Sequence, residues 1–567
     1  MSKRIDRRTF VRSALTAGAG VLLAPSAAWS AAQKARLASE GAFAQGVASG
    51  EPATSAITLW TRLDGVSASA NVGYEVARDA GFAKVVASGT AVADAAADFT
   101  VHQRVSGAFL EPGEQYYYRF RTAADSSPVG RFRTARPAGS SETVRIAFFS
   151  CQEFIAGFYA AHRDLAAQDV DLVVCLGDYI YEQAFASTGS TNAPVRTDDS
   201  AADGEAQTLA EYRRKYSLYH SDANLREVRR HFALVGEWDD HEVEDNYAGD
   251  VPGGAAKDRR VPFAERRANG YRAWFEHMPR RLAGAPKIYG SLPLGGAELF
   301  ILDSRQYRGD QPCNPTDAAL SQPCPPTTTD DPSRTLLGAE QKAWLKGALS
   351  ASRARWKVIA NQVMICSLDA PPHNPLNTDS WDGYGADRAE LVDHIAADAI
   401  DDVTFVTGDI HTFFAGDVTR TGRRTVRGED RIDPVNGPSR ATEFVGGAIT
   451  SPGIVDRAAS TETERVAAAA PADAAVLANN PHLAYANQAY KGYCILEAGA
   501  GQLDVRYQAV HEQRDPDSGV FTLRRFRVDS GQPVVIDQGG PLPAGPRRPS
   551  ARAPRRARRS VRRADRW

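Results

Sequence analysis

The 567-residue sequence contains few cysteines and no long apolar run. Six cysteines are too few for disulfides to hold a chain of this length together, so the fold must rest on apolar cores. No segment approaches the roughly 18 consecutive apolar residues that a membrane-spanning helix needs, which excludes an integral membrane protein. With 43% hydrophobic and 24% charged residues, the composition is that of a soluble globular protein, and the length predicts two domains with appendages.

Excess charge of one sign is also absent, because the formal net charge is only -2, but the charges are unevenly distributed. Residues 1–32 carry five basic side chains against one Asp, and residues 546–567 carry ten Arg against one Asp, so the remaining body is acidic. An acidic body argues against nucleic-acid binding, sequence-specific or not. An enzyme acting on phosphate anions would need cations supplied locally by a metal or by Arg.

The N-terminus predicts a twin-arginine signal over residues 1–32. Arg7 and Arg8 precede a weakly apolar stretch and then a region of small residues, which is the layout of such a signal. We expect cleavage near Ser30 to Ala32, with a basic amphipathic helix as the alternative. The partner during export would be the twin-arginine translocase, which carries folded proteins, and the location would be periplasmic or secreted.

Residues 33–138 predict a small antiparallel β-sandwich. Short apolar or alternating runs such as AITLWTRL, NVGYEVAR and QYYYRFRT are separated by Gly, Pro and Asp. Residues 142–515 differ, because apolar strands there alternate with helical stretches, and this pattern indicates an α/β domain. We interpret residues 420–440 and 456–480 as loops or excursions and residues 516–545 as a C-terminal extension. Residues 546–567 predict a disordered tail that either docks on anionic surfaces or is a solvated extension.

Six predicted strands of the α/β domain end in polar or metal-binding groups. Ligands bind beyond the carboxyl ends of the strands in such sheets, so we expect the six ends to converge on one crevice. A single Asp after a strand could instead cap the next helix, but six such ends together indicate a site. The ends are Cys151-Gln152, Asp178–Glu182, Asp239–Glu242, Asp303–Arg305, Asn361-Gln362 and Asp409–His411.

These ends resemble the motif series of calcineurin-like metallophosphoesterases. The purple-acid-phosphatase branch has GDxxY, GNHE, VxxH and GHxH, where this sequence has GDYIY, DDHE, VIAN and GDIH in the same order. Asp409 and Asn361 therefore replace His, and Asp240 replaces Asn. These departures resemble PhoD-type alkaline phosphatases, as do FAQGVASGEP at 43–52, LWTR at 59–62, LGAEQKAWL at 337–345, WDGY at 381–384 and NPH at 480–482.

The resemblance covers roughly residues 41–510 and implies both a fold and an activity. The fold is α/β, with a central metallophosphoesterase β-sandwich flanked by helices in an α/β/β/α-like arrangement, preceded by a small all-β immunoglobulin-like sandwich. The activity is hydrolysis of phosphate mono- and diesters with iron and calcium. Secreted actinobacterial phospholipase D enzymes share this framework, so phospholipase D action on phosphatidylcholine-type lipids is an alternative.

The donor types divide into two metal positions. A thiolate, a phenolate, an imidazole and a bridging carboxylate suit Fe(III), whereas a position with only oxygen donors suits one or two Ca²⁺, with Mg²⁺ or Mn²⁺ as alternatives. The first position would use Cys151, Tyr181, His411 and bridging Asp178, and the second would use Asp178, Asp240, Asn361 and Asp409. Cys151 could instead be a small buried hydrophobe. Asp240 has close competitors in Asp239, Glu242, Asp245 and Asn246.

Two residues are candidates for catalytic roles beside the metals. The nucleophile would be hydroxide on the metal, and His241 would donate a proton to the departing alkoxide, unless it is a structural histidine bonded to Asp239. The planar fork of Arg305 matches two phosphate oxygens, with a salt bridge as the alternative. Trp381, Tyr384 and His482 would line the substrate pocket, although large aromatics are more often core.

Cys313 and Cys324 flank a Pro-rich loop and predict a disulfide in an oxidising compartment. We expect a monomer whose ligands are small phosphate esters or phospholipid head groups. A functional alternative of a different class is an exported binding protein in which the metal site is only structural. Structural metal sites are closed and need no proton donor, so the six strand ends and His241 favour an enzyme.

Overall fold

The computed structural model describes residues 29–184, 194–201, 204–253, 259–313, 324–370, 374–422, 432–433, 437–457 and 459–540. Most of the predicted signal and the whole Arg-rich tail lie outside the described residues, so both stay predictions. In the described part of the chain, no helix is long and apolar enough to cross a membrane.

Two large sheets face each other across a shared apolar core. The ten-stranded sheet has the order β25 (Ile536–Gly539), β24 (Val520–Asp529), β23 (Gln502–Val510), β22 (Lys491–Ala498), β8 (Val144–Phe149), β9 (Leu172–Leu176), β10 (Ala233–Glu237), β1 (Val47–Ala53), β2 (Ala56–Arg62) and β5 (Thr100–Ser106). The seven-stranded sheet has the order β11 (Gly290–Pro293), β12 (Ala297–Ile301), β13 (Trp356–Asn361), β16 (Val403–Thr407), β20 (Ala441–Val445), β17 (Phe413–Val418) and β21 (Leu483–Asn487).

Strand alternation explains why helices cover the outer faces of both sheets. In β8, Ile146 and Phe148 face the core between the sheets, while Ala147 and Phe149 pack outward against helices. The helices on that outer face are α3 (Ala160–Leu165), α4 (Leu209–Tyr219), α5 (Ala223–His231) and α6 (Phe263–His277). The seven-stranded sheet is covered by α8 (Gly338–Ala351) and α9 (Gly385–Ala397). The predicted α/β/β/α arrangement is confirmed.

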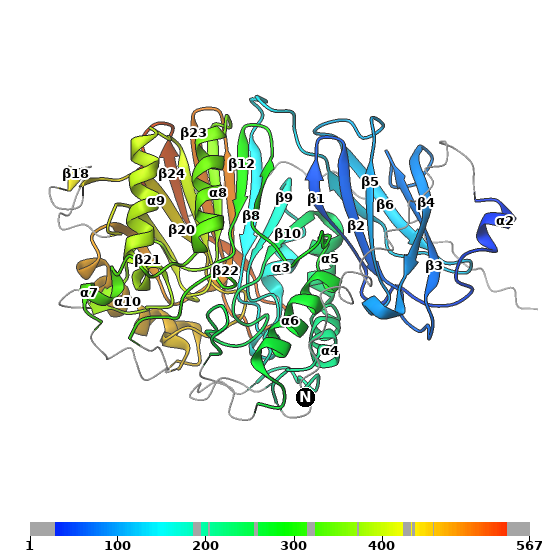
Figure 1. Cartoon of the computed structure of the whole chain (residues 1–567), viewed down its shortest axis with the longest axis horizontal. Coiled ribbons are helices and arrows are strands. Elements are labelled where there is room, and N and C mark those ends of the chain that lie inside the picture. Colours follow the sequence, from blue (N-terminus) through cyan, green and yellow to red (C-terminus); the bar gives the residue numbers. More distant parts are fainter. Residues whose placement is uncertain are drawn as a thin grey trace, which may run out of the picture.

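The N-terminal strands form a second sandwich at one end of the molecule (Figure 1). A four-stranded sheet of β4 (Val85–Ala93), β3 (Ala70–Ala77), β6 (Gln115–Arg121) and β7 (Gly130–Arg133) shares one apolar core with β1, β2 and β5. The two sandwiches are not separate, because β1 pairs in parallel with β10 through Ser49 and Ala233. The short helix α2 (Ala31–Lys34) precedes this region.

Two segments differ from the sequence-based interpretation. Residues 516–545, expected as an appended extension, supply β24 and β25 of the ten-stranded sheet. Residues 456–480, expected as a loop or an excursion, contain the helix α10 (Glu462–Asn479), so the loop interpretation does not hold there. The Thr461 side chain accepts a hydrogen bond from Glu464 N, and the Glu464 side chain reaches back to the Thr461 backbone, which closes a capping box at the start of α10. The remaining short helix is α7 (Pro326–Thr329).

The strands that precede the polar ends form two parallel units, one in each sheet. β8, β9 and β10 run parallel in the ten-stranded sheet, and β12, β13 and β16 run parallel in the seven-stranded sheet. Within each unit, therefore, the carboxyl ends meet at one edge of the sheet.

Candidate metal centre

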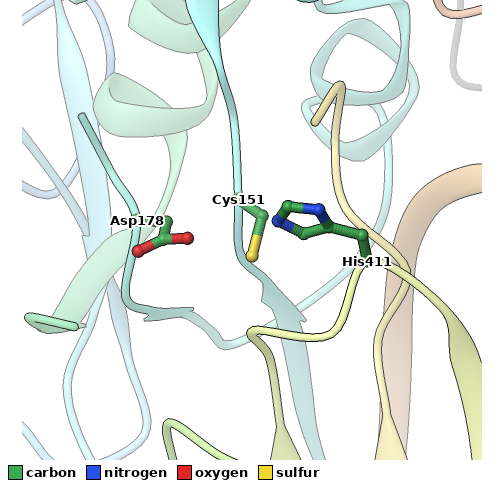
Figure 2. A group of neighbouring side chains, drawn as sticks. All are labelled: Cys151, Asp178 and His411. Atoms are coloured by element: carbon green, nitrogen blue, oxygen red, sulfur yellow. The ribbon is translucent and has the colours of Figure 1, made fainter. Parts of the chain in front are cut away.

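Cys151, Asp178 and His411 come from three different segments and point into one space (Figure 2). Cys151 follows β8, Asp178 follows β9, and His411 lies between β16 and β17. One potential ligand atom from each lies within 4.8 Å of the others. A thiol, a carboxylate and an imidazole thus meet where the sequence predicts the iron position.

Two more groups of potential ligands adjoin this one and share members with it. Asp178 groups with Asp240 and His241, and Asp240 groups with Asp239 and Asp409, again with ligand atoms within 4.8 Å of one another. Asp178 and Asp240 therefore link all three groups into a single centre, which we call the metal centre.

The backbone is in the left-handed region at four positions of this centre. The φ angles are 57° at Cys151, 52° at Asp178, 66° at Asp409 and 56° at His411. Left-handed non-glycine residues cost on the order of 1 kcal/mol each, and such outliers cluster at functional sites. Glycine is required next to one of them, because a Cβ on Gly177 would lie 2.4 Å from Asp239 Cβ.

Tyr181 belongs to the same cluster. Its hydroxyl donates to Asp178 Oδ2 at 2.9 Å and lies 3.2 Å from His411 Nε2. Ser451, a residue that the sequence analysis did not single out, places its hydroxyl 2.7 Å from the Tyr181 oxygen and 2.8 Å from the carbonyl oxygen of Cys151. Burial, and next the Asp178 carboxylate, raise the pKa of both Cys151 and Tyr181 well above their usual values. Deprotonating these donors therefore needs a cation nearby.

The carboxylates of the centre carry oxygens that accept no hydrogen bond in the described part of the chain. Among the described residues, Asp178 Oδ1, Asp239 Oδ2 and Asp240 Oδ1 are buried and accept no hydrogen bond. Burial raises the pKa of Asp178 and Asp409 well above the usual range and that of Asp239 to about 6, and neighbouring carboxylates add to each effect. Clustered carboxyl groups whose pKa is raised for want of a countercharge fit metal ions, which would supply that positive charge.

Arg305 is fully buried and its guanidinium is occupied by carboxylates. It donates to Asp239, and its two Nη atoms donate to Asp379 at 2.8 and 2.6 Å. Nη2 also lies 3.5 Å from Asp240 Oδ1. We expected Arg305 to grip substrate phosphate, but the structure shows the salt-bridge alternative. Burial raises the pKa of Asp240, but the cations of Arg305 and His241 outweigh this effect, so the pKa of Asp240 is lowered.

His241 is held by Glu182. The partner expected from the sequence, if His241 were a structural histidine, was Asp239. Its Nδ1 lies 2.7 Å from Glu182 Oε2, and its ring stacks on Tyr181 with the ring centroids 4.0 Å apart. The side chain is 13% exposed, so solvent and a substrate can reach it. Burial lowers the pKa of His241, but Glu182, Asp240 and Asp178 outweigh it and raise the pKa well above the usual value.

The remaining predicted site residues lie in the packed interior. Asn361 accepts a hydrogen bond on Oδ1 from Trp381 Nε1 at 3.1 Å, so this amide oxygen is engaged with a core side chain. The Tyr384 hydroxyl donates to Gly309 O, and His482 Nε2 lies 2.7 Å from Ser367 O. Trp381, Tyr384 and His482 are 0%, 0% and 2% exposed, so they are core residues. The expectation that they line the substrate pocket gives way to the core alternative.

Cys313 and Cys324 are joined by a disulfide, with the Cα atoms 5.6 Å apart. Gln311, two residues before Cys313, donates to Asp379 Oδ1 at 2.6 Å, and Asp379 is the carboxylate that also binds Arg305. The disulfide therefore lies close in sequence to a residue that contacts the partner of Arg305. The other four cysteines, Cys151 among them, are free and buried.

The fold and the centre define the class of the protein. Paired sheets with clustered Asp and His side chains beyond parallel strands are the arrangement that the sequence analysis expected of a metallophosphoesterase. A solved structure of the purple acid phosphatase PPD1 from yellow lupin matches 85% of this chain and 73% of its own, with 11% identity and a TM-score of 0.50, a likeness of fold alone.

Within that class, the chain belongs to the PhoD-like phosphatase family. The family's catalytic model matches residues 146–507, and the model of its N-terminal domain matches residues 28–136. Alkaline phosphatase D of Bacillus subtilis (strain 168) is 35% identical over 549 residues, which is 93% of this chain and 88% of that protein. A solved structure of PhoD covers 89% of this chain and 93% of its own, with 32% identity and a TM-score of 0.77.

Proposed function

We propose that this chain is an exported alkaline phosphatase and phosphodiesterase with an iron and calcium centre. The observation that carries the proposal is the metal centre itself, where three orphaned carboxylate oxygens adjoin a thiol, a phenol and an imidazole. Structural metal sites are closed and use few ligand types, so this mixed and partly exposed donor set favours catalysis over a binding protein.

The chain's own residues divide the work of holding the metals. Cys151, Tyr181 and His411 would hold Fe(III) together with Asp178, while Asp239, Asp240 and Asp409 would hold Ca²⁺ through oxygen alone. When bound, the metals supply an acidic water ligand and neutralise charge on the phosphate. Asp239 is thereby added to the calcium ligands that the sequence predicts. Asn361 would have to release its hydrogen bond from Trp381 to take part.

His241 is suited to protonate the leaving group. With Nδ1 bound to Glu182, Nε2, which lies 3.8 Å from Asp245 Oδ1, would protonate the departing alkoxide oxygen, and the buried Glu182 carboxylate stabilises the imidazolium before the proton leaves. Glu182 also accepts from Asp245 N at 2.9 Å, which fixes its own position. Cations on Asp178 and Asp240 would lower the pKa of His241 again, which makes the proton easier to donate.

Export by the twin-arginine pathway is part of the proposal and is supported by the Arg7-Arg8 signal pattern. This route carries folded proteins and would allow the metals and the Cys151 thiolate to be buried before the protein meets an oxidising compartment. The disulfide between Cys313 and Cys324 fits such a destination.

The test is hydrolysis by protein stripped of metal and reloaded with Fe(III) and Ca²⁺, or with zinc or manganese. Substrates are 4-nitrophenyl phosphate, bis(4-nitrophenyl) phosphate and phosphatidylcholine vesicles. We expect iron with calcium to restore hydrolysis of both aryl esters. Choline release without aryl ester hydrolysis would identify phospholipase D, which no specific observation favours. Absence of hydrolysis with every metal would favour the alternative of an exported binding protein whose metal site is only structural.

A matched pair of variants controls for the buried thiol. Cys151→Ser should abolish the restored hydrolysis, because the serine hydroxyl is a far weaker anionic donor. Cys494→Ser changes a buried thiol on β22, the strand paired with β8, and no residue of the metal centre is altered. It should keep the activity. Equal activity of the two variants would contradict a metal-ligating role of Cys151.

A further inference from the structure

His411 is held at its ring by one short segment and at its backbone by one buried side chain. Its Nδ1 lies 2.9 Å from the carbonyl oxygen of Pro452. The backbone carbonyl oxygen of His411 accepts a hydrogen bond from Lys491 Nζ at 3.2 Å. The ring and the backbone of this residue are therefore both held by groups outside its own loop.

Those two contacts are connected through an ion pair. Lys491 Nζ lies 2.8 Å from Asp456 Oδ2, and the two side chains are 1% and 0% exposed. The same Asp456 oxygen accepts the backbone N–H of Gly453 at 2.7 Å, and Gly453 directly follows Pro452. The contacts form a closed circuit from the His411 carbonyl through Lys491, Asp456 and the segment 452–453 back to the His411 ring.

Close packing at Gly453 gives independent support for this circuit. A Cβ built on Gly453 would lie 3.1 Å from Lys491 Nζ, 3.3 Å from His411 O and 3.5 Å from Asp456 Oδ2. A Cβ at this position would thus meet the three polar partners at once. A side chain here would push the ion pair away from the carbonyl that it holds.

A second cation reaches the same carboxylate from α10. Arg465 Nε lies 3.8 Å from Asp456 Oδ1, and Arg465 is itself bound to Glu512 at 3.0 Å. Asp456 therefore has a cation on each of its two oxygens, and loss of Lys491 alone would leave this carboxylate paired.

Stability alone is a weak reason for a buried ion pair, because desolvating two charges costs about as much as their attraction returns. Orientation is a stronger reason. A histidine that donates from Nδ1 to a carbonyl keeps a lone pair on Nε2, and such partners behind a ligand fix its tautomer and ring plane. Here Nε2 faces the Tyr181 hydroxyl at 3.2 Å and lies in the group of Cys151 and Asp178.

We propose that the Asp456–Lys491 pair is a positioning device for His411. It holds the Pro452 carbonyl against Nδ1 and the His411 backbone in place, so that Nε2 presents its lone pair to the space shared with Cys151 and Asp178. The proposal rests on the proposed function, in which His411 is a metal ligand. Lys491 and Asp456 act through His411, so they are positioning residues and not catalytic residues.

The test compares Lys491→Met, Lys491→Arg and Asp456→Asn in the full chain. The control is Lys215→Met, which removes another buried Lys–Asp pair, with Asp198, at side-chain exposures of 0% and 1%. The first readout is the tautomer of His411 in metal-free protein, from multiple-bond NMR of ¹⁵N-histidine-labelled samples, with His411→Gln to assign the signals. The second is the rate at which loaded protein loses iron to a chelator.

We expect the wild type to carry its proton on Nδ1. Lys491→Met and Asp456→Asn should give mixed tautomers and lose iron on the order of 10- to 100-fold faster. Lys491→Arg should restore most of the retention, and Lys215→Met should lower the melting temperature without changing either readout. Unchanged tautomer and iron loss in a folded Lys491→Met protein would overturn the proposal.

Should Lys491→Met not fold, Lys491→Arg and Asp456→Asn still decide the question, because each keeps a polar group in the same space. Failure of the proposed function is distinguishable, since then the wild type itself would retain no iron. The tautomer measurement needs no metal and tests the circuit in either case.

Discussion

The two halves of the metal centre are held in place by different means. The sulfur and ring half, Cys151, Tyr181 and His411, hydrogen-bonds with neutral groups such as the Ser451 hydroxyl and the Pro452 carbonyl, while the Lys491 cation binds the backbone carbonyl of His411. The carboxylate half, Asp239, Asp240 and Asp409, is bordered by the buried guanidinium of Arg305. Asp178 belongs to both halves.

The difference follows from the charge that each donor carries before metal binds. A thiol, a phenol and a neutral imidazole can be buried without a countercharge, and the raised pKa of Cys151 and the pKa of about 4 for His411, both caused first by burial, keep them uncharged. Clustered carboxylates are harder to bury in their charged form, since burial and their neighbours raise the pKa of Asp409 and Asp239, and the chain places the fixed cation of Arg305 beside them. The comparison teaches that one half needs orientation and the other needs charge compensation.

The largest effect is expected for Asp178→Asn, because this residue serves both halves. The amide keeps the volume but removes the anionic charge, so metal content should fall in both halves and hydrolysis should drop on the order of 10³-fold or more. Metal analysis and a 4-nitrophenyl phosphate assay check this. Loss of calcium with full retention of iron would show that the halves are independent.

Arg305→Met should affect the carboxylate half selectively. It removes the cation from a buried network, so we expect metal-free protein to lose about 3 to 5 kcal/mol of unfolding free energy, with Ca²⁺ recovering part of it. Chemical denaturation with and without calcium measures this.

Arg308→Met is the matched control, since Arg308 binds Asp379 at 2.6 Å and, in the described part of the chain, forms no ion pair with Asp239 or Asp240. It should also destabilise the protein, but calcium should not recover the loss preferentially. An equal calcium response in both variants would contradict charge compensation by Arg305.

His241→Gln should slow catalysis while leaving both metals bound. Removing a proton donor costs typically 10²- to 10⁴-fold, and the loss should be greatest for alkyl phosphates, whose leaving groups are poor. Esters of acidic phenols should be affected least, and Glu182→Gln should act in the same direction. A uniform loss across leaving groups would exclude the proton-donor role.

The smallest effect concerns acid stability outside both halves. His162 is fully buried beside Gln152, and burial lowers its pKa to about 3. Because the unfolded chain binds this proton near pH 6.5, stability present above that pH is lost as the pH falls toward 3, by about 2 kcal/mol at pH 5. His162→Gln should flatten the decline between pH 6.5 and 5. An unchanged slope in denaturation curves would count against a neutral buried His162.

The strand ends were predictable because each follows an apolar run that can only be a strand in this pattern. The ends supplied Cys151, Asp178, Tyr181, Asp240, Asp409 and His411. The partners that hold them were not predictable, because Asp379 lies 74 residues from Arg305 and Ser451 lies 270 residues from Tyr181. Trp381 was assigned to the pocket, with the core as the alternative, because WDGY has the composition of an exposed turn, and the structure buries it. The helix α10 was missed although its capping box, Thr461 with Glu464, is visible in the sequence.

The central claim is that the sulfur and ring half binds Fe(III), and the visible spectrum of the purified protein together with its metal content tests it most directly. The account predicts iron and calcium in the protein and a charge-transfer band from phenolate and thiolate that changes in Tyr181→Phe. A colourless protein that carries zinc or manganese and is indifferent to Tyr181→Phe would contradict it.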